Sequence, residues 1–599
     1  MPTVALFDLG SSSSRGMLLD MDTKQLIWQD KANSCSTAAD AVAVFDRFQN
    51  ALSKFEAPSA VACSSFVGNH IQHSGTAATI GILTTYSTQG SDVLPPDIVE
   101  QLATVSGALP CAAYLTGNFF ALRSDTTKLD CLGAWQLQHT FHVPRHISIS
   151  EAAWLGVLPW SAPMAASFAE DCQFAGFDLP TQLIQALGLL PAVQTHPMQG
   201  SLGAHTVSSV FPCIGDGAAA SLGSAALLLA SQHVTRTAHQ AAQPQPRPTM
   251  CISIGTSAAV RCILPLNERT EACVQEHLDT VVLQSGGWVY RVAPDAVLLG
   301  AAMTDGAAVL QDLHNTLTDA FTYVLPQGGS SAEACAEEAL HACMQELAAQ
   351  PAVLPGHSTV LPMLGGERAP GMRGGAASGI ATHLRRGDGL RSAVLARVQG
   401  VCCQLADLVQ AILPAIGVTS VQECHIVGSG AALEMGSLWR RVLSNALGAP
   451  VWTACSQRGQ ASNAGKAEDT GAAAPGSKSA PPQPSTLQLE TTSIGLLVHC
   501  LWHLRQPALE GPSQDSGSSS SSSFAAAADA CSAHPGDLGR TFAQWTGAVL
   551  PCLPQLCSTV PDDGEANRQA WSTARQRYAD VYASAERSGL LPSRVSKQP

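Results

Sequence analysis

The chain has 599 residues, of which 46% are hydrophobic and 13% are charged, so it is too long for one core and predicts two domains with insertions. Its formal net charge is -14 and no basic stripe runs along it, which argues against nucleic acid and against an anionic membrane as partners. Its 19 cysteines include no C-x-x-C pair, which predicts free, mostly buried thiols rather than a zinc site.

The first predicted elements are short strands joined by turns, with no helix between them. Residues 4–7 are a compact apolar run, and 16–20 and 25–28 resume extended patterns. Because the first strand begins so near the start, we expect no signal or transit peptide and a cytoplasmic protein. A Walker-type phosphate loop runs from a strand into a helix, whereas this first turn lies in a hairpin.

The first turn is rich in groups that suit phosphate oxygens. Asp8 ends the first strand and Arg15 precedes the second. Between them lie a glycine and a run of hydroxyls, beginning with Gly10, Ser11, Ser12 and Ser13. Taken alone, the turn could equally be a serine-rich hairpin without a function.

The second motif is Asp216 between two glycines, Gly215 and Gly217, at the start of an alanine-rich stretch. An aspartate in this position is usually a helix N-cap, but its carboxylate could also accept a proton from a closely approaching substrate. The apolar stretch 217–232 is short and rich in small residues, so it predicts a packed helix and not a membrane span.

A proline-rich stretch at 237–248 predicts the junction between two domains, 1–236 and 249–599. After it, a strand at 250–254, a turn and a strand-like run at 258–264 repeat the opening pattern of the chain. The repetition predicts duplicated sheets around a cleft. The turn between these two strands is Gly255, Thr256 and Ser257.

Further along, helical periodicity covers 331–349 and 391–413, and a third glycine turn follows a strand at 424–427. Two stretches, at about 456–486 and 506–539, bury too little apolar surface to order themselves and predict flexible surface insertions. The third turn consists of Gly428, Ser429, Gly430 and Ala431. Together, the three turns and the nearby aspartates point to an ATP-dependent kinase of the two-lobed, actin-like kind.

These motifs resemble those of the FGGY family of carbohydrate kinases, and most closely those of its gluconokinase branch. The similarity runs in family order from the first strand to near the C-terminus. The matching stretches are 7–15, 215–218, 253–257 with 260–261, 299–306, 366–371, 437–439 with 447–451, and 577–582.

The resemblance implies an α/β fold of two actin-like (ribonuclease-H-like) ATPase domains around a nucleotide and sugar cleft. The first domain would bind a small-molecule sugar, and the second would bind ATP. Asp216 would be the catalytic base, and Asp8 and Asp216 would hold Mg2+, Asp8 through water. The nucleotide-binding residues would be Gly10, Ser11, Ser12, Ser13, Arg15, Gly255, Thr256, Ser257, Asp305, Gly306, Gly428, Ser429, Gly430 and Ala431. Because the family often dimerises, the resemblance also suggests a homodimer.

The sequence departs from the family pattern mainly where the sugar would bind. Residues 85–90 lack the acid and the arginine of the gluconokinase branch, and Asn118 replaces a lysine, which puts a carboxylated sugar in doubt. The departures keep open a second hypothesis, a non-catalytic homologue that binds nucleotide or sugar as a sensor or scaffold. On the ATP side, Arg441 and Asn445 replace a glutamine and an aspartate.

Two pairs of residues near the predicted cleft can each have one of two roles. His70 and His73 either contact a sugar hydroxyl or are ordinary polar residues. Glu367 and Arg368 either shape the cleft or form a structural ion pair.

Overall fold

The computed structural model describes residues 3–9, 13–33, 44–65, 198–236, 247–265, 288–325, 331–363, 379–455, 491–505 and 555–588, with short gaps inside several ranges, and a few isolated residues. Some of the predicted features lie outside the described residues. These are Gly10, Ser11 and Ser12, His73, 85–90, Asn118, Glu367 with Arg368, and the stretches 456–486 and 506–539.

The first sheet contains the predicted strand–turn–strand opening of the chain. Its strands are β1 (Thr3–Leu9), β2 (Ser13–Asp20), β3 (Gln25–Asn33), β4 (Ala60–Ser65), β7 (Met198–Leu202), β8 (His205–Val210) and β9 (Ile214–Gly215). The order is β3-β2-β1-β4-β8-β7, and β9 pairs with the end of β4. β1 and β2 are antiparallel, whereas β4 runs parallel to β1, so the ends of β1 and β4 lie at the same edge of the sheet.

The second sheet repeats this plan. Its strands are β10 (Thr249–Ile254), β11 (Ala258–Pro265), β12 (Trp288–Ala293), β13 (Ala296–Met303), β16 (His425–Ser429), β17 (Val451–Cys455) and β18 (Gln555–Thr559). The order is β12-β13-β11-β10-β16-β17-β18. β10 and β11 form an antiparallel hairpin and β16 runs parallel to β10, as β4 does to β1. The duplicated sheets expected from the repeated strand–turn–strand pattern are therefore observed.

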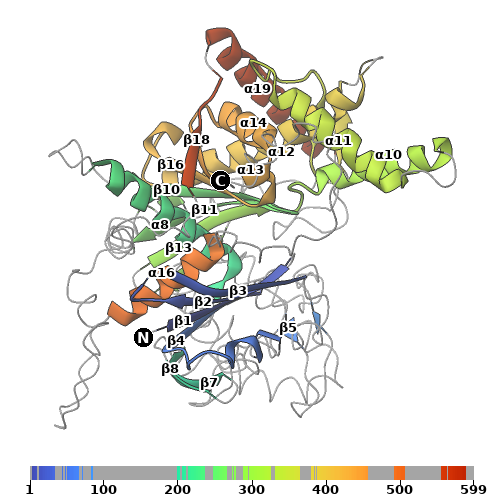
Figure 1. Ribbon diagram of the computed structural model, residues 1–599. Helices are drawn as coiled ribbons and strands as arrows, with labels where there is room; N and C mark the ends of the chain where they lie inside the picture. The colour runs from blue at the N-terminus through green and yellow to red at the C-terminus, as the bar shows by residue number, and fades with distance from the viewer. Residues whose placement is uncertain are drawn as a thin grey trace, which may run out of the picture.

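Two helices, α8 (Asp216–Arg236) and α16 (Thr491–Arg505), lie between the sheets (Figure 1). They cross with their backbones in contact, because a Cβ atom on Gly223 would lie 1.8 Å from the Thr491 carbonyl oxygen. Likewise, a Cβ atom on Gly495 would lie 1.7 Å from the Ala219 carbonyl oxygen. Although α16 belongs to the second half of the chain, its apolar residues share a core with strands β1, β2 and β4 of the first sheet.

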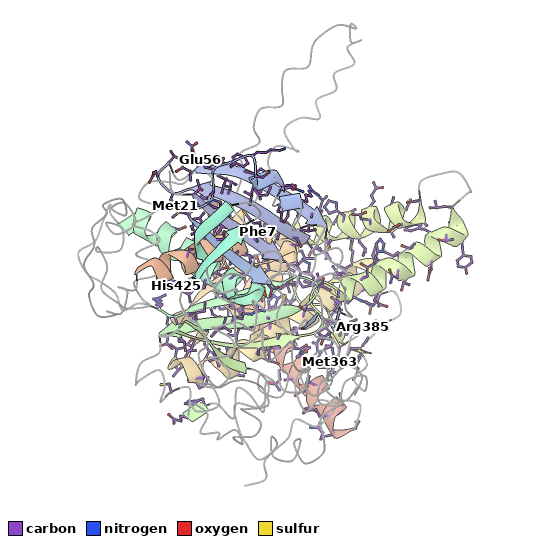
Figure 2. All side chains as sticks on the ribbon, turned by 90° about the horizontal axis from the view of Figure 1, so that it is seen from below. Phe7, Met21, Glu56, Met363, Arg385 and His425 are labelled. Carbon is purple, nitrogen blue, oxygen red and sulfur yellow. The ribbon has the colours of Figure 1, made fainter. Side chains whose placement is uncertain are left out.

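The remaining helices surround the second sheet or extend from it. They are α10 (Val309–Val324), α11 (Ala332–Ala348), α12 (Leu390–Ile412), α13 (Ala431–Met435), α14 (Ser437–Leu447) and α19 (Glu565–Arg587), with short 3-10 helices at Pro414–Ile416 and Val421–Glu423. The predicted helices at 331–349 and 391–413 correspond to α11 and α12. Figure 2 shows the α10–α11 pair extending away from the body of the molecule.

Two small two-stranded sheets complete the described elements. They pair β5 (His70–Ile71) with β6 (Leu83–Thr84) and β14 (Thr359–Leu361) with β15 (Ile380–Thr382).

The apolar helix α12 is the one helix of the described residues whose length and composition would allow it to cross a membrane. Of its most apolar stretch, 72% is buried inside the structure, as in a core helix. Among the described cysteines, Cys251, Cys262, Cys402 and Cys500 are buried and free, as expected. Cys557 is disulfide-bonded, so the expectation of free thiols is wrong at this position.

Candidate active site

The site begins with Asp8, near the end of β1 and beside Phe7, which Figure 2 labels on the strands of the first sheet. The Asp8 side chain is buried, and both its oxygens accept hydrogen bonds, Oδ1 from Ser64 Oγ at 2.8 Å and Oδ2 from Arg15 Nη1 at 3.0 Å. Ser64 is the register partner of Asp8 on β4, and Arg15 is its register partner on β2. Strand pairing thus assembles this group from three segments of the chain.

Asp216 reaches the same edge of the sheet by a different route. β9 pairs in parallel with the end of β4, with Ser65 opposite Gly215, so the first residue of α8 follows directly beyond that edge. Asp216 Oδ1 accepts a hydrogen bond from the backbone N–H of Gly217 at 2.7 Å, at the positive end of the helix dipole. The structure therefore brings the two predicted carboxylates, Asp8 and Asp216, near one another.

The pKa of Asp8 reflects this crowded environment. Burial raises the pKa of the Asp8 carboxyl from its usual 3.8 to about 6, although the Ser64 hydrogen bond and the Arg15 charge act to lower it. The negative charge of Asp216 raises the pKa further. A carboxyl that is buried beside a second carboxyl is destabilised in its charged form, and a cation placed between the two would relieve the repulsion.

In the second sheet, the β10–β11 turn is held mainly through its carbonyl groups. The carbonyl oxygen of Thr256 accepts a hydrogen bond from Gly306 N at 2.7 Å, and that of Gly255 accepts one from Ala307 N at 2.7 Å. A Cβ atom on Gly306 would lie 2.5 Å from the Ser257 carbonyl oxygen, so only glycine allows this contact. Among the described residues, the backbone N–H groups of Thr256 and Ser257 have no acceptor, as a phosphate-binding turn requires.

The third predicted turn lies at the end of the neighbouring strand. Ser429 of β16 is the register partner of Ser253 on β10. Gly430 follows with φ +92°, a conformation that favours glycine, and a Cβ atom there would lie 2.6 Å from the Ile254 carbonyl oxygen. The strand register and this contact put the turn at 428–431 beside the turn at 255–257, on one edge of the second sheet.

Several of the predicted nucleotide-binding residues, in both sheets, are buried or already have a partner. Gly428 packs inside the sheet, where a Cβ atom would meet Thr453 and Leu433 side chains at 2.9 and 3.0 Å. Ser13 and Asp305 are also buried. Arg15, predicted to lie near the phosphates, is engaged by Asp8. The nucleotide contacts of these residues remain predictions.

Arg441 and Asn445, which replace two family residues on the predicted ATP side, share a partner in the structure. Both bind Asp562, Arg441 Nη2 at 2.7 Å and Asn445 Nδ2 at 2.9 Å. Burial acts to raise the pKa of Asp562, but these hydrogen bonds outweigh it and hold the pKa below its usual value. Arg441 also donates to the carbonyl oxygen of Ala348 at 2.7 Å, so this group links α11, α14 and the segment before α19.

Helix α8 contacts the second sheet at a point that the sequence does not indicate. The guanidinium group of Arg261, on β11, lies against Gly217, because a Cβ atom on Gly217 would be 2.6 Å from Arg261 Nη2. Arg261 Nη1 donates to Ser253 Oγ at 2.9 Å. One side chain therefore spans from the residue next to Asp216 to the strand that carries the Gly255 turn.

Comparison with known proteins finds a family match within the second half of the chain. Residues 250–462 match the model of the C-terminal domain of the FGGY family of carbohydrate kinases. No curated protein sequence matches the chain.

Several solved structures are similar to the whole chain. Ligand-bound xylulose kinase from Lactobacillus acidophilus has 13% sequence identity and a TM-score of 0.55, with 98% of each chain covered. Gluconate kinase from the same organism has 13% identity and a TM-score of 0.53, again with 98% of each chain covered. Plasmodium falciparum glycerol kinase with ADP has 11% identity and a TM-score of 0.53, with 97% of this chain and 98% of that chain covered.

At such low identity, these similarities establish the fold and leave the activity open. The two duplicated sheets with α8 and α16 between them form the two-domain, actin-like ATPase fold expected from the sequence. Within that fold, residues 250–462 are similar to the C-terminal domain of FGGY carbohydrate kinases.

Proposed function

We propose that the protein is an ATP-dependent kinase that phosphorylates a hydroxyl group of a sugar, polyol or sugar acid. The observation that carries the proposal is the contact between Arg261 and Gly217. Since Arg261 also donates to Ser253, two residues before Gly255, this contact connects the neighbour of Asp216 with the strand that leads into the Gly255 turn. A proton acceptor and a phosphate-binding turn on opposite sides of one junction are what phosphoryl transfer requires.

In this proposal, Asp216 accepts the proton of the substrate hydroxyl. As the proton leaves, the hydroxyl oxygen forms a bond to the γ-phosphorus of ATP, and the bond from that phosphorus to the bridging oxygen breaks to release ADP. The backbone N–H groups of Thr256 and Ser257 would bind the phosphates. Arg15 donates to Asp8 Oδ2 and holds this carboxylate in place.

The residues present also fit Mg2+. Asp8 and Asp216 are two neighbouring carboxylates whose repulsion contributes to the raised pKa of Asp8. Mg2+ commonly binds one or two carboxylates and substrate phosphates while it keeps several waters, and it neutralises phosphate charge. Because both Asp8 oxygens already accept hydrogen bonds, contact through water suits this residue best.

The substrate is proposed only as a class. The similar structures are named as xylulose, gluconate and glycerol kinases, which span a ketopentose, a sugar acid and a polyol. Assignment to the gluconokinase branch remains a prediction, as do a cytoplasmic location and a homodimer. A gluconate-like or pentulose-like compound is the first choice to test.

The test is ADP release from Mg2+-ATP with the full chain against gluconate, xylulose, ribulose and glycerol. We expect turnover with at least one compound, and a loss of about a thousandfold or more in Asp216→Ala, because the base for the hydroxyl proton is removed. Asp580→Ala, at an exposed position of α19, is the matched control and should retain activity. ATP binding without turnover on any compound would contradict the kinase and favour the sensor or scaffold hypothesis.

A further inference from the structure

The hairpins of the two sheets each place an arginine of the second strand against a polar residue just before the turn. In the first hairpin, Arg15 Nη1 lies 3.0 Å from Asp8 Oδ2. In the second, Arg261 Nη1 lies 2.9 Å from Ser253 Oγ. The partner is a carboxylate in one case and a neutral hydroxyl in the other, so only Arg15 has its charge neutralised by its partner.

The rest of the Arg261 guanidinium points to the other domain. Its Nη2, Cζ and Nε atoms lie 2.6, 2.7 and 2.8 Å from the position that a Cβ atom on Gly217 would occupy. In the part of the chain that the structure describes, Ser253 is the one hydrogen-bond acceptor of Arg261, and no carboxylate forms an ion pair with it. A guanidinium group has five N–H donors, so Arg261 retains donors that can bind an anion.

The Arg261 guanidinium group lies between the two sides that exchange the phosphoryl group in the proposed function. On one side is Gly217, the neighbour of Asp216, and on the other is Ser253, two residues before Gly255. In the proposed function the phosphoryl group moves from ATP on the turn to a hydroxyl at Asp216, which are the two sides that Arg261 connects. Charge on its oxygens during transfer is best stabilised by donors that are already in place.

We propose that Arg261 is a catalytic residue that binds the phosphoryl group during its transfer. The proposal rests on the proposed function and adds a residue to it. The guanidinium N–H groups donate to the oxygens of the transferring group while the bond to the bridging oxygen breaks and the bond to the substrate oxygen forms. The proton goes to Asp216, ADP leaves, and Arg261 stays charged throughout.

The test compares Arg261→Met, Arg261→Lys and a matched control in the full chain. We measure by calorimetry the affinity for Mg2+-ADP alone and for Mg2+-ADP with aluminium fluoride, which mimics the transferring phosphoryl group. In Arg261→Met we expect ADP affinity within about threefold of the original chain, and a loss of about 100-fold in the added affinity from aluminium fluoride, as for other pre-positioned donors. Arg261→Lys should recover part of that loss, since it retains the charge.

The control is Arg397→Met on α12, which removes an ion pair with Asp312 outside the site and should leave both affinities unchanged. A purely structural role for Arg261 predicts equal losses of ADP and of ADP with aluminium fluoride, and that result would overturn the proposal. So would unchanged affinities in Arg261→Met. If the original chain itself binds neither ADP nor the mimic, the proposed function fails, which is a separate and recognisable outcome.

Gly217→Ala provides a second test that leaves Arg261 in the sequence. Its methyl group would displace the guanidinium group, and alanine suits the first turn of a helix, so the effect should fall on the phosphoryl mimic and not on folding. We expect a loss of at least about tenfold in the affinity added by aluminium fluoride, smaller than in Arg261→Met. Gly356→Ala, where the nearest atom would be 3.7 Å away, is the control, and an effect equal to that of the control would contradict the proposal.

Discussion

The β1–β2 and β10–β11 hairpins have the same plan but a different balance of charge. Each ends its first strand at a glycine turn, and each holds an arginine against the residue two positions before that glycine. In the first hairpin this residue is Asp8, which is buried and has a raised pKa. In the second it is Ser253, which is neutral.

The same backbone motif therefore carries a neutral pair in the first sheet and a positively charged pair in the second. The Asp8–Arg15 pair is neutral as a unit when Asp8 is ionised, and in the proposed function its carboxylate is a Mg2+ ligand. The Ser253–Arg261 pair keeps a net positive charge and directs it toward the other domain. Substitutions in and around the two hairpins test this difference.

Ser253→Asp would give the second hairpin the charge balance of the first. The new carboxylate would pair with Arg261 and neutralise it, so we expect kcat to fall about 100-fold, comparable to the loss of one pre-positioned donor. Steady-state kinetics with the substrate found in the sugar panel would measure it. Ser253→Ala, which removes only a neutral hydrogen bond, should cost less than about tenfold. Equal effects of the two substitutions would show that the charge of Arg261 is unimportant.

Gly306→Ala tests the backbone packing that holds the second turn. Its methyl group would lie 2.5 Å from the Ser257 carbonyl oxygen, and backbone atoms at that distance cannot give way as a flexible side chain can. We expect a loss of about 2–3 kcal/mol in the free energy of unfolding and a weaker affinity for ADP. Urea denaturation and calorimetry measure these two quantities. Stability equal to that of Gly356→Ala would contradict the prediction.

Arg15→Met removes the partner of a buried carboxylate. We expect a loss of about 2 kcal/mol in the free energy of unfolding at pH 8, and a smaller loss at pH 5, where Asp8 can take up a proton. Arg261→Met should cost less than about 1 kcal/mol, because Ser253 carries no charge. Urea denaturation at both pH values separates the two arginines. A similar cost for both would mean that the two hairpins do not differ in charge balance.

Asp8→Asn should make the protein more stable at neutral and alkaline pH. The pKa of Asp8 is about 6 in the folded chain and near 3.8 in the unfolded chain, so folding favours its protonated form. The stabilisation from that proton is complete below pH 3.8 and is lost as the pH rises through 6. At pH 8 asparagine avoids the buried charge.

For Asp8→Asn we therefore expect a gain of about 1 kcal/mol at pH 8 that disappears near pH 4, measured by urea denaturation with a chelator present. This gain should accompany a loss of turnover, since the asparagine cannot serve as the predicted carboxylate ligand. A difference from the original chain that does not vary with pH would contradict the assigned pKa.

Much of the local structure could be predicted from the sequence. The apolar run at 4–7 lies in β1, and the helical pattern at 331–349 corresponds to α11 (Ala332–Ala348). These elements follow from the spacing of apolar residues, which each segment carries within itself. Asp8 could also be selected, because it ends a predicted strand, and Asp216 because it lies between two glycines at the start of an alanine-rich stretch.

The sequence could not predict which distant side chains meet. Arg261 stands in an ordinary strand pattern, and nothing nearby in the sequence shows that it contacts Gly217. Arg441 and Asn445 fit a helix after the third turn, but their partner Asp562 is more than a hundred residues away. Similarly, α16 lies between two low-complexity stretches and packs against strands from the start of the chain.

The sequence alone was enough to predict the repeated strand–turn–strand pattern, the glycine turns and the carboxylate that ends the first strand, because periodicity and turn chemistry are local properties. How these parts are combined depends on contacts between distant segments. Strand register brings Ser64 and Arg15 to Asp8, and the domain junction brings Arg261 to Gly217. Whether an arginine is neutralised or left charged depends on the side chain that faces it across a strand or a domain, and this is fixed by packing in three dimensions.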